Sequence, residues 1–340
     1  MSLKNKLRAF ADIGRAQGIA VTASIAICGA LSSTSAVEWY HIVYFTLVAC
    51  FLHTTLNTYI AKNDVKLDIH TYTPERNPII AGELTEREAL SYVWRGTAVG
   101  FLLIIPFFLT PNYNYSFVIP TLICALVGFF WLVWYGYKGK FYLFSYDFVF
   151  SISYSFCVLF GVFAVCGMPT VYTWIYIGVT IFATTAFAQW ENGLKDVDAD
   201  RKAGVKSFAV AFGVRSGESL GLHPYLAYGI SLKSLFILFC FLAFLECKDF
   251  HYLLFLLIYG LVTQIFILYR FATLSKAIEH RKTILLDVAL TGILVYSTIY
   301  GKAGIGWVGF LIIYLILGYL IGSGIQKKCE FKFRRFPYGS

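Results

Sequence analysis

Charged residues are scarce in this sequence. Only 14% of its 340 residues are charged whereas 58% are apolar, a balance that excludes an ordinary soluble globular domain. The eight cysteines include no CxxC pair and most fall inside apolar runs, which argues against a disulfide framework or a thiolate metal site. No two of the six histidines have the spacing of a metal-binding pair. Residues 1–17 are polar and basic, and the apolar run behind them has no clear cleavage site, so no cleavable signal peptide is expected.

In place of charge, the sequence has long apolar runs. Almost all of it divides into ten runs of about 17–25 residues, the length at which a helix crosses a bilayer. We therefore predict an all-α fold, a polytopic membrane bundle of about nine or ten transmembrane helices around a central cavity. Only residues 300–305 separate the last two runs, so the number of spans stays open between nine and ten. The expected spans are residues 19–35, 40–61, 88–109, 115–134, 145–167, 171–192, 225–245, 252–271, 284–300 and 305–323.

The formal net charge of +9 is distributed unevenly along the chain. If the N-terminus is cytoplasmic, 24 lysines and arginines fall on the inner side and two on the outer side, while Arg95 and Lys233 lie within spans. This asymmetry fits the positive-inside rule and explains the basic excess without a nucleic-acid partner. We expect one domain over residues 1–340, with an amphipathic interfacial segment over 1–17 and a basic cytoplasmic tail over 324–340.

Two pairs of aspartates interrupt the apolar pattern, Asp64 with Asp68 and Asp196 with Asp200. The members of each pair are four residues apart, so on a helix both carboxylates project from one face. Both pairs follow even-numbered spans and therefore lie on the same side of the membrane, which the charge distribution makes the cytoplasmic side. Two parallel pseudo-repeats, related by an axis along the membrane normal, would bring the pairs face to face across one cavity. Solvated loop charges are the weaker alternative, since each pair is followed by basic residues and a glycine.

Converging carboxylates need counter-charge, and Mg²⁺ suits them because one or two carboxylates and substrate phosphates usually hold it together. We therefore assign Asp64, Asp68, Asp196 and Asp200 to metal binding and catalysis. Basic residues near both pairs would contact the oxygens of a diphosphate: Arg76, Lys140, Arg201, Lys202 and Lys206. Arg15, at the mouth of the first span, either binds phosphate or anchors its helix. Metal ions would neutralise charge on a departing diphosphate, and aromatic side chains would stabilise the allylic cation left behind.

Residues near the fourth and fifth spans complete the predicted substrate pocket. Tyr135 and Tyr137 lie where the fourth span ends, and an interfacial aromatic belt with lysine anchors is the alternative role for this segment. Asp147 lies just inside the fifth span, where an ionisable side chain is costly and usually faces the interior of the bundle. An apolar shaft between helices would suit a long isoprenoid tail.

At these residues the sequence resembles the UbiA superfamily of intramembrane prenyltransferases. Its first aspartate motif is similar to Asp64-x-x-x-Asp68 followed by Arg76-Asn77-Pro78 and Gly82. Its second is similar to Asp196-x-x-x-Asp200-Arg201-Lys202-x-Gly204-x-Lys206, and its tyrosine- and lysine-bearing loop to residues 135–140. Members usually have Asn-Asp ahead of the first motif, where this chain has Ile60-Ala61. The resemblance leaves Asn57 or Asn63 to substitute there, with Asn192 as the corresponding cofactor-binding residue of the second motif.

The resemblance implies Mg²⁺-dependent transfer of an isoprenyl chain from a prenyl diphosphate to a small lipophilic acceptor within the lipid bilayer. The acceptor would be an aromatic quinone precursor, a glycerol-phosphate lipid or a tetrapyrrole. A membrane terpene cyclase of the same superfamily is the alternative, in which the cation is quenched internally without an acceptor. A cation-coupled transporter is less favoured, because transporters place such charges near the bilayer midplane and these lie at the ends of spans. The oligomeric state is not readable from the sequence.

Overall fold

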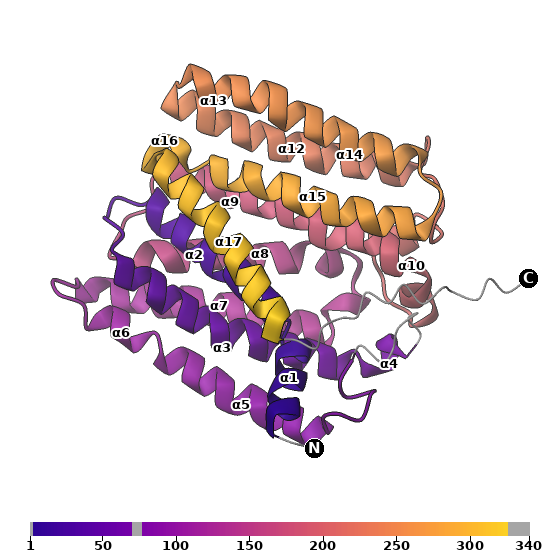
Figure 1. Cartoon of the computed structure of the whole chain (residues 1–340), viewed down its shortest axis with the longest axis horizontal. Helices are drawn as coiled ribbons and strands as arrows, with labels where there is room; N and C mark the ends of the chain where they lie inside the picture. The colour runs from indigo at the N-terminus through magenta and orange to yellow at the C-terminus, as the bar shows by residue number, and fades with distance from the viewer. Residues whose placement is uncertain (1–2, 70–76, 326–340) are drawn as a thin grey trace, which may run out of the picture.

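The computed structural model describes residues 3–69 and 77–325, apart from the side chains of residues 3, 143–147, 188 and 277. Every regular element in these ranges is a helix (Figure 1). This confirms the prediction of an all-α fold.

The N-terminal part of the chain runs as far as residue 164. The short helix α1 (Leu3–Ile13) meets the next helical segment at a bend of 56°. Helix α5 begins at a capping box in which Thr85 and Glu88 satisfy each other's backbone N–H groups. The other helices of this part are α2 (Ile19–Ser32), α3 (Trp39–Asn63), α4 (Val65–Asp68), α5 (Glu86–Leu102), α6 (Ile105–Phe108), α7 (Val118–Tyr137) and α8 (Leu143–Ala164).

The C-terminal part begins with one long helical run. Helix α9 (Val171–Thr184) continues through a π-helical segment, Thr185–Glu191, into α10 (Asn192–Lys202). The helical run therefore continues past the sixth expected span, 171–192, because no residue breaks the helix before Lys202. The remaining helices are α11 (Phe208–Ala211), α12 (Pro224–Cys247), α13 (Phe250–Phe255), a second π segment (Leu256–Leu261), α14 (Val262–Thr273), α15 (Ala277–Ser297), α16 (Tyr300–Ala303) and α17 (Ile305–Ile325).

Each of the ten expected spans coincides with a helix or a helical run. Within the described residues seven of these are long and apolar enough to cross a membrane, and the bent pair of α1 and α2 makes eight if it counts as one span. In α8 the apolar stretch Phe148–Ala164 is shorter. Helix α15 starts at Ala277 and not at residue 284, and its first turns carry charged side chains. The chain thus folds as a multi-pass membrane bundle.

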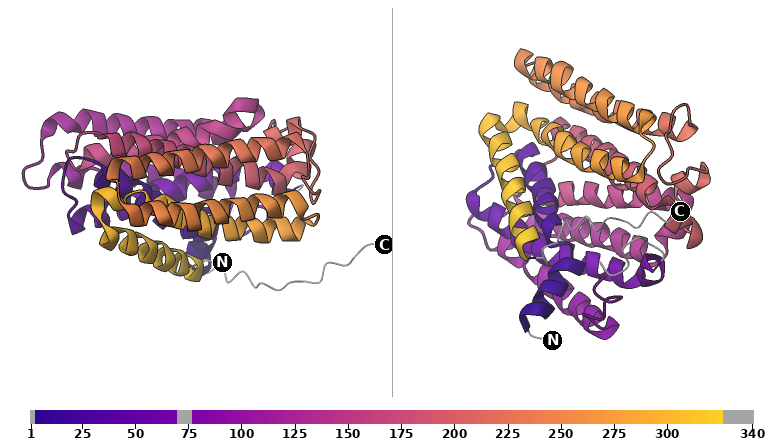
Figure 2. Two further views of the ribbon diagram at one scale, coloured as in Figure 1. Left: turned by 90° about the horizontal axis from the view of Figure 1, so that it is seen from above. Right: turned by 45° about the vertical axis from the view of Figure 1, so that its right-hand side comes forward.

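Helix α2 packs against α3, α8, α9 and α17, and α17 runs along the outside of the bundle (Figures 1 and 2). Glycines allow the backbones of α2 and α8 to touch. A Cβ atom at Gly161 would lie 1.9 Å from the carbonyl oxygen of Ala26, and one at Gly29 would lie 2.1 Å from that of Val158. Small residues at such contacts are typical of packed membrane helices.

Both aspartate pairs lie at one end of the bundle. Helix α4, which carries Asp68, packs against α10, which carries Asp196 and Asp200 (Figure 1). The connections from α12 to α13 and from α16 to α17 lie at the opposite end (Figure 1). The fold therefore gathers the acidic residues expected to act together, although they are more than 120 positions apart in the chain.

Candidate active site at the ends of two helices

The first aspartate pair lies where α3 ends. Asp64 follows the last residue of α3 and begins α4, a single turn in which the N–H of Asp68 donates to the Asp64 carbonyl over 2.7 Å. The Asp64 carboxylate forms an ion pair with Lys140, and both side chains are only 12–13% exposed. Oδ2 of Asp68 accepts a hydrogen bond of 2.8 Å from Nδ2 of Asn77. The two aspartates of this pair thus lie within one helical turn of each other.

Burial raises the pKa of the Asp68 carboxyl group above its ordinary value. The hydrogen bond from Asn77 and the positive charges of Lys140 and Arg15 oppose this rise in pKa, while the charge of Asp64 adds to it. Desolvation disfavours the charged form of a carboxyl group, and here it is the largest of these effects. A cation bound at this position would favour the ionised carboxylate and would therefore lower this pKa.

The loop after α7 connects the two pairs. Lys140 belongs to the 3₁₀ turn Gly139–Phe141, and its ammonium lies 5.3 Å from the centre of the Tyr135 ring. The backbone carbonyl of Lys140 accepts a hydrogen bond of 3.1 Å from the N–H of Lys206, which follows the second pair. Lys140 is therefore linked to the first pair through its side chain and to the second through its backbone.

An apolar cluster lies under this connection. The Tyr135 ring packs with Ile60 of α3, Val149 of α8 and Val205 of the segment after α10. Tyr137, two residues later, has 59% of its surface exposed, so its ring does not join this cluster. The structure thus places the Tyr135 ring beside Lys140 and leaves Tyr137 exposed, and the pocket roles predicted for both residues stay predictions.

The second pair lies on α10. Asp196 forms an ion pair of 3.3 Å with its neighbour Lys195. The backbone carbonyl of Asp200 accepts a hydrogen bond of 2.9 Å from the N–H of Val205, and this closes the end of the helix. Gly204 lies in this turn with φ of +75°, a left-handed conformation that favours glycine. The turn sends the chain back toward the loop that holds Lys140.

The basic residues after the second pair differ in their contacts. The Arg201 guanidinium donates to the Asp198 carboxylate at 3.2 Å and to the backbone carbonyl of Val214. Lys202 and Lys206 are exposed. In this structure the Arg201 guanidinium is thus engaged by Asp198 and Val214, and the diphosphate contacts predicted for all three residues stay predictions.

The donors present fit Mg²⁺ when a substrate shares it. Among the described residues no three His, Cys, Asp or Glu side chains lie close enough together to hold a metal ion by themselves. The two aspartate pairs nevertheless supply hard carboxylate oxygens from helices that pack together. Mg²⁺ is usually bound through one or two carboxylates, with waters and substrate phosphates completing its shell. Nδ2 of Asn63 is buried beside the first pair with no hydrogen-bond partner within the described part of the chain.

A sequence model of the UbiA prenyltransferase family matches residues 20–277. The chain belongs to this family. The 4-hydroxybenzoate solanesyltransferase of Synechocystis sp. (strain ATCC 27184 / PCC 6803 / Kazusa) is 38% identical over 81 residues. That match covers 24% of this chain and 27% of the relative, so it spans about a quarter of either protein.

Solved structures of UbiA homologues have the same fold. One from Archaeoglobus fulgidus, bound to GPP and Mg²⁺, has a TM-score of 0.65 at 14% identity over 90% of this chain and 99% of that chain. The structure described for digeranylgeranylglyceryl phosphate synthase has a TM-score of 0.61 at 19% identity over 88% of this chain and 99% of that one. These likenesses show that the UbiA fold extends over nearly the whole described chain.

Arg15 lies near the first motif in an unusual backbone conformation. Its φ of 50° and ψ of 54° are left-handed, which is uncommon for a residue other than glycine. Its carbonyl oxygen lies 3.1 Å from Nε2 of His53, and its charge reaches the Asp68 carboxyl group. His53 had no predicted role, and no signal in the sequence distinguishes it from an ordinary helix residue. The structure shows that it joins α3 to the residue before the first 3₁₀ turn.

Two of the three predicted asparagine ligands, Asn57 and Asn192, are engaged by carbonyl groups of their own helical runs. The Asn57 amide donates to the carbonyl of His53 over 2.9 Å, and that of Asn192 donates to the carbonyl of Phe187 over 3.2 Å. Arg76 and the side chain of Asp147 lie outside the described residues. The roles predicted for all four side chains stay predictions.

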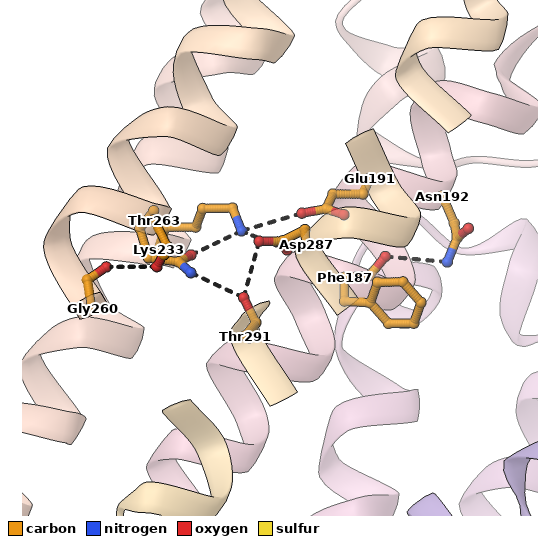
Figure 3. A network of polar contacts seen from close by, with 9 residues as sticks. Phe187, Glu191, Asn192, Lys233, Gly260, Thr263, Asp287 and Thr291 are labelled. Carbon is orange, nitrogen blue, oxygen red and sulfur yellow. Dashed lines mark hydrogen bonds and ion pairs between the residues drawn. The ribbon is translucent and has the colours of Figure 1, made fainter. Parts of the chain in front are cut away.

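An ionic cluster that contains none of the predicted site residues lies in the C-terminal part of the bundle (Figure 3). Lys233 of α12 is 2% exposed and lies between two carboxylates, with distances of 3.2 Å to Glu191 and 2.8 Å to Asp287. A lysine inside a span is expected to pair with an acid, so a signal was present. Which acid it meets depends on how α12, α15 and the first π segment pack.

Proposed function

We propose that this UbiA-family protein transfers an isoprenyl group from a prenyl diphosphate to a small lipophilic acceptor, with Mg²⁺ as its cofactor. The convergence of the two aspartate pairs on Lys140 carries the proposal. Asp64 pairs with the Lys140 side chain, and the segment after Asp200 bonds to its backbone. Support also comes from Archaeoglobus fulgidus homologues of the same fold, which bind GPP or DMAPP together with Mg²⁺.

Each charged residue then has a part in binding and activating the diphosphate. Asp64, Asp68, Asp196 and Asp200 would hold Mg²⁺, which neutralises charge on the diphosphate as its bond to the prenyl carbon breaks. The Lys140 ammonium, which forms an ion pair with Asp64 in this structure, would donate a hydrogen bond to a phosphate oxygen. Lys202 and Lys206 are exposed at the same end of the bundle and would add positive charge.

The carbon skeleton reacts beneath these charges. The diphosphate leaves with the electron pair of the carbon–oxygen bond, and the acceptor forms a new bond to that carbon and loses a proton. Water must be kept out, because it would capture the allylic cation. The apolar cluster of Ile60, Tyr135, Val149 and Val205 lies under Lys140, and the Tyr135 ring presents a π face that attracts positive charge.

The acceptor is proposed to be an aromatic ring or a glycerol-phosphate lipid. The first class fits the name of the Synechocystis relative and the second the name of the synthase with the same fold. The proposal includes a cytoplasmic location for the N-terminus and both aspartate pairs, which the distribution of lysine and arginine supports, and one domain over residues 1–340.

The test is product analysis with purified protein in lipid nanodiscs. Labelled prenyl diphosphates of several chain lengths are incubated with Mg²⁺, with and without 4-hydroxybenzoate or a glycerol-phosphate lipid. We expect Mg²⁺-dependent diphosphate release and a prenylated acceptor. A hydrocarbon or alcohol formed without acceptor would identify a cyclase instead. Unchanged turnover in both Asp64→Ala and Asp196→Ala would refute the assignment of the site.

A further inference from the structure

The direction in which α10 presents its aspartates depends on the π segment that precedes it. An α-helix advances about 100° per residue, since it has about 3.6 residues per turn. A π turn bonds residue i to i+5 and so accommodates one extra residue. Asp196 and Asp200 follow the π segment Thr185–Glu191. They therefore face a direction about 100° from the one that an uninterrupted α-helix would give them.

Contacts with neighbouring helices hold this π segment along its length. At its start, the Thr185 hydroxyl lies 2.7 Å from that of Ser151 on α8. Near its end, Nε1 of Trp190 donates to the carbonyl of Tyr225 on α12 over 3.0 Å, and the Tyr225 hydroxyl donates back to the Trp190 carbonyl over 2.8 Å. Asn192 closes the segment by donating to the carbonyl of Phe187. These bonds satisfy carbonyl groups at a place where the helical pattern is irregular.

Glu191, the last residue of the segment, lies against a buried lysine. Its side chain is completely buried and lies 3.2 Å from Nζ of Lys233. Lys233 also contacts Asp287 of α15 and donates to Gln264 of α14 over 3.0 Å. Thr291 completes the cluster by donating to Asp287 and accepting from Gln264, both over 3.0 Å (Figure 3). One lysine thereby ties the end of the π segment to three further helices.

The second π segment also lies next to a residue of this ionic cluster. Two π segments occur in the described residues, and the second, Leu256–Leu261, ends three residues before Gln264. The first π segment thus ends in Glu191, and the second is followed closely by Gln264. Both side chains belong to this ionic cluster. π-helical turns are rare and are often retained at functional sites.

We propose that Lys233 and Glu191 are positioning residues for metal binding. Their ion pair keeps the π segment in place and so fixes the direction in which α10 presents Asp196 and Asp200 to the first motif. This inference rests on the proposed function, because it assigns those aspartates to Mg²⁺. A cluster that only joined helices would affect thermal stability and leave the affinity for the metal unchanged.

The first measurement is the binding of Mn²⁺, followed by electron paramagnetic resonance, to full-length protein in nanodiscs. Mn²⁺ serves as the probe because it accepts the same carboxylate ligands as Mg²⁺. For Lys233→Met we expect affinity about 10–100-fold weaker than in the wild type, the usual effect of losing a residue that orients metal ligands. If Lys233→Met does not fold, Glu191→Gln replaces it, with the same direction of change expected. Thr173→Val removes the buried hydroxyl contact with Ser32 and is the control that leaves the π segment intact.

A second pair of variants tests the direction of α10 itself. Deleting Ala188 removes the extra residue of the π segment, and we expect Mn²⁺ binding to be lost. Inserting an alanine between Glu191 and Asn192 in the same variant restores the direction of α10, and binding is expected to return in part. Wild-type affinity in folded Lys233→Met, or in the Ala188 deletion, would overturn the inference. A wild-type protein that binds no Mn²⁺ and releases no diphosphate would refute the proposed function instead.

Discussion

The ammonium of Lys140 contacts the carboxylate of Asp64 across 76 positions of the sequence, and little of either side chain is exposed. This ion pair joins the end of α3 to the loop after α7. It also places a cation between the first aspartate pair and the segment after the second, whose Lys206 bonds to the backbone of Lys140.

Replacing Lys140 by methionine tests its assignment to the diphosphate. A hydrogen bond to a charged group contributes about 1.5–3 kcal/mol, so we expect KM for the prenyl diphosphate to rise about ten- to a hundredfold. Lys138→Met is the matched control, because that lysine lies in the same loop over the exposed Tyr137 ring. Steady-state kinetics at saturating Mg²⁺ provide the measurement. Equal KM values for Lys140→Met and wild type would contradict the assignment.

Comparing Asp196→Asn with Asp198→Asn distinguishes the loss of a proposed metal ligand from the loss of a nearby surface carboxylate. Asp198 forms a half-exposed ion pair with Arg201, an interaction that contributes about 0–1 kcal/mol. Losing electrostatic stabilisation of the leaving group costs about 100–1,000-fold in kcat, and we expect a loss of that size for Asp196→Asn alone. The rate of Mg²⁺-dependent diphosphate release is measured for both variants. Comparable losses in the two variants would show that general charge, and not a specific ligand, is needed.

The pH dependence of metal binding should reflect the protonation of the Asp68 carboxyl group. Its pKa is raised by burial, so its protonated form persists to higher pH than that of an ordinary carboxyl group. Mn²⁺ affinity should therefore fall as the pH drops through this raised pKa. Asn77→Ala removes a hydrogen bond that lowers the pKa, so the fall should begin at higher pH. Mn²⁺ titrations at a series of pH values decide this, and a curve unchanged by Asn77→Ala would contradict it.

The raised pKa of Asp68 also affects the stability of the folded protein. Because its folded-state pKa is raised, its contribution to stability is fully present below the pKa of the unfolded chain. That contribution is lost as the pH rises through the folded-state pKa. Without metal, Asp68→Asn should therefore remove a penalty and should not destabilise the protein at neutral pH. Thermal unfolding in the presence of a chelator measures this, and a clear fall in Tm would count against it.

The contact between α2 and α8 should tolerate no side chain at Gly161. Its Cβ would lie 1.9 Å from a backbone oxygen, which cannot move aside as a flexible side chain would. Overpacking of this kind costs about 1–3 kcal/mol, so we expect Gly161→Ala to lower the Tm in nanodiscs. Gly292→Ala on α15 is the control, since a Cβ there meets no atom within 4 Å. The prediction fails if the two variants unfold at the same temperature.

Much of the fold could be predicted because its signals are local. The length of an apolar run sets whether a helix can cross a bilayer, and all ten expected runs are helical. The spacing of Asp64 and Asp68 predicted a helical turn, which the structure contains. Boundaries were less accurate at α10 and α15, where charged residues continue a helix beyond its apolar part. Composition alone does not show where such a helix stops.

The candidate site was predictable in its acidic residues and less so in their partners. The sequence by itself determined a helical membrane protein with two aspartate pairs, because helix length and residue spacing are properties of a continuous stretch. Only the tertiary structure decided that Lys140 meets Asp64, that Asn77 meets Asp68, and that Lys233 holds Glu191 and Asp287. It also decided that a π segment precedes α10. These features depend on contacts between helices far apart in the chain, where a shift of one residue turns a side chain about 100° away from its partner.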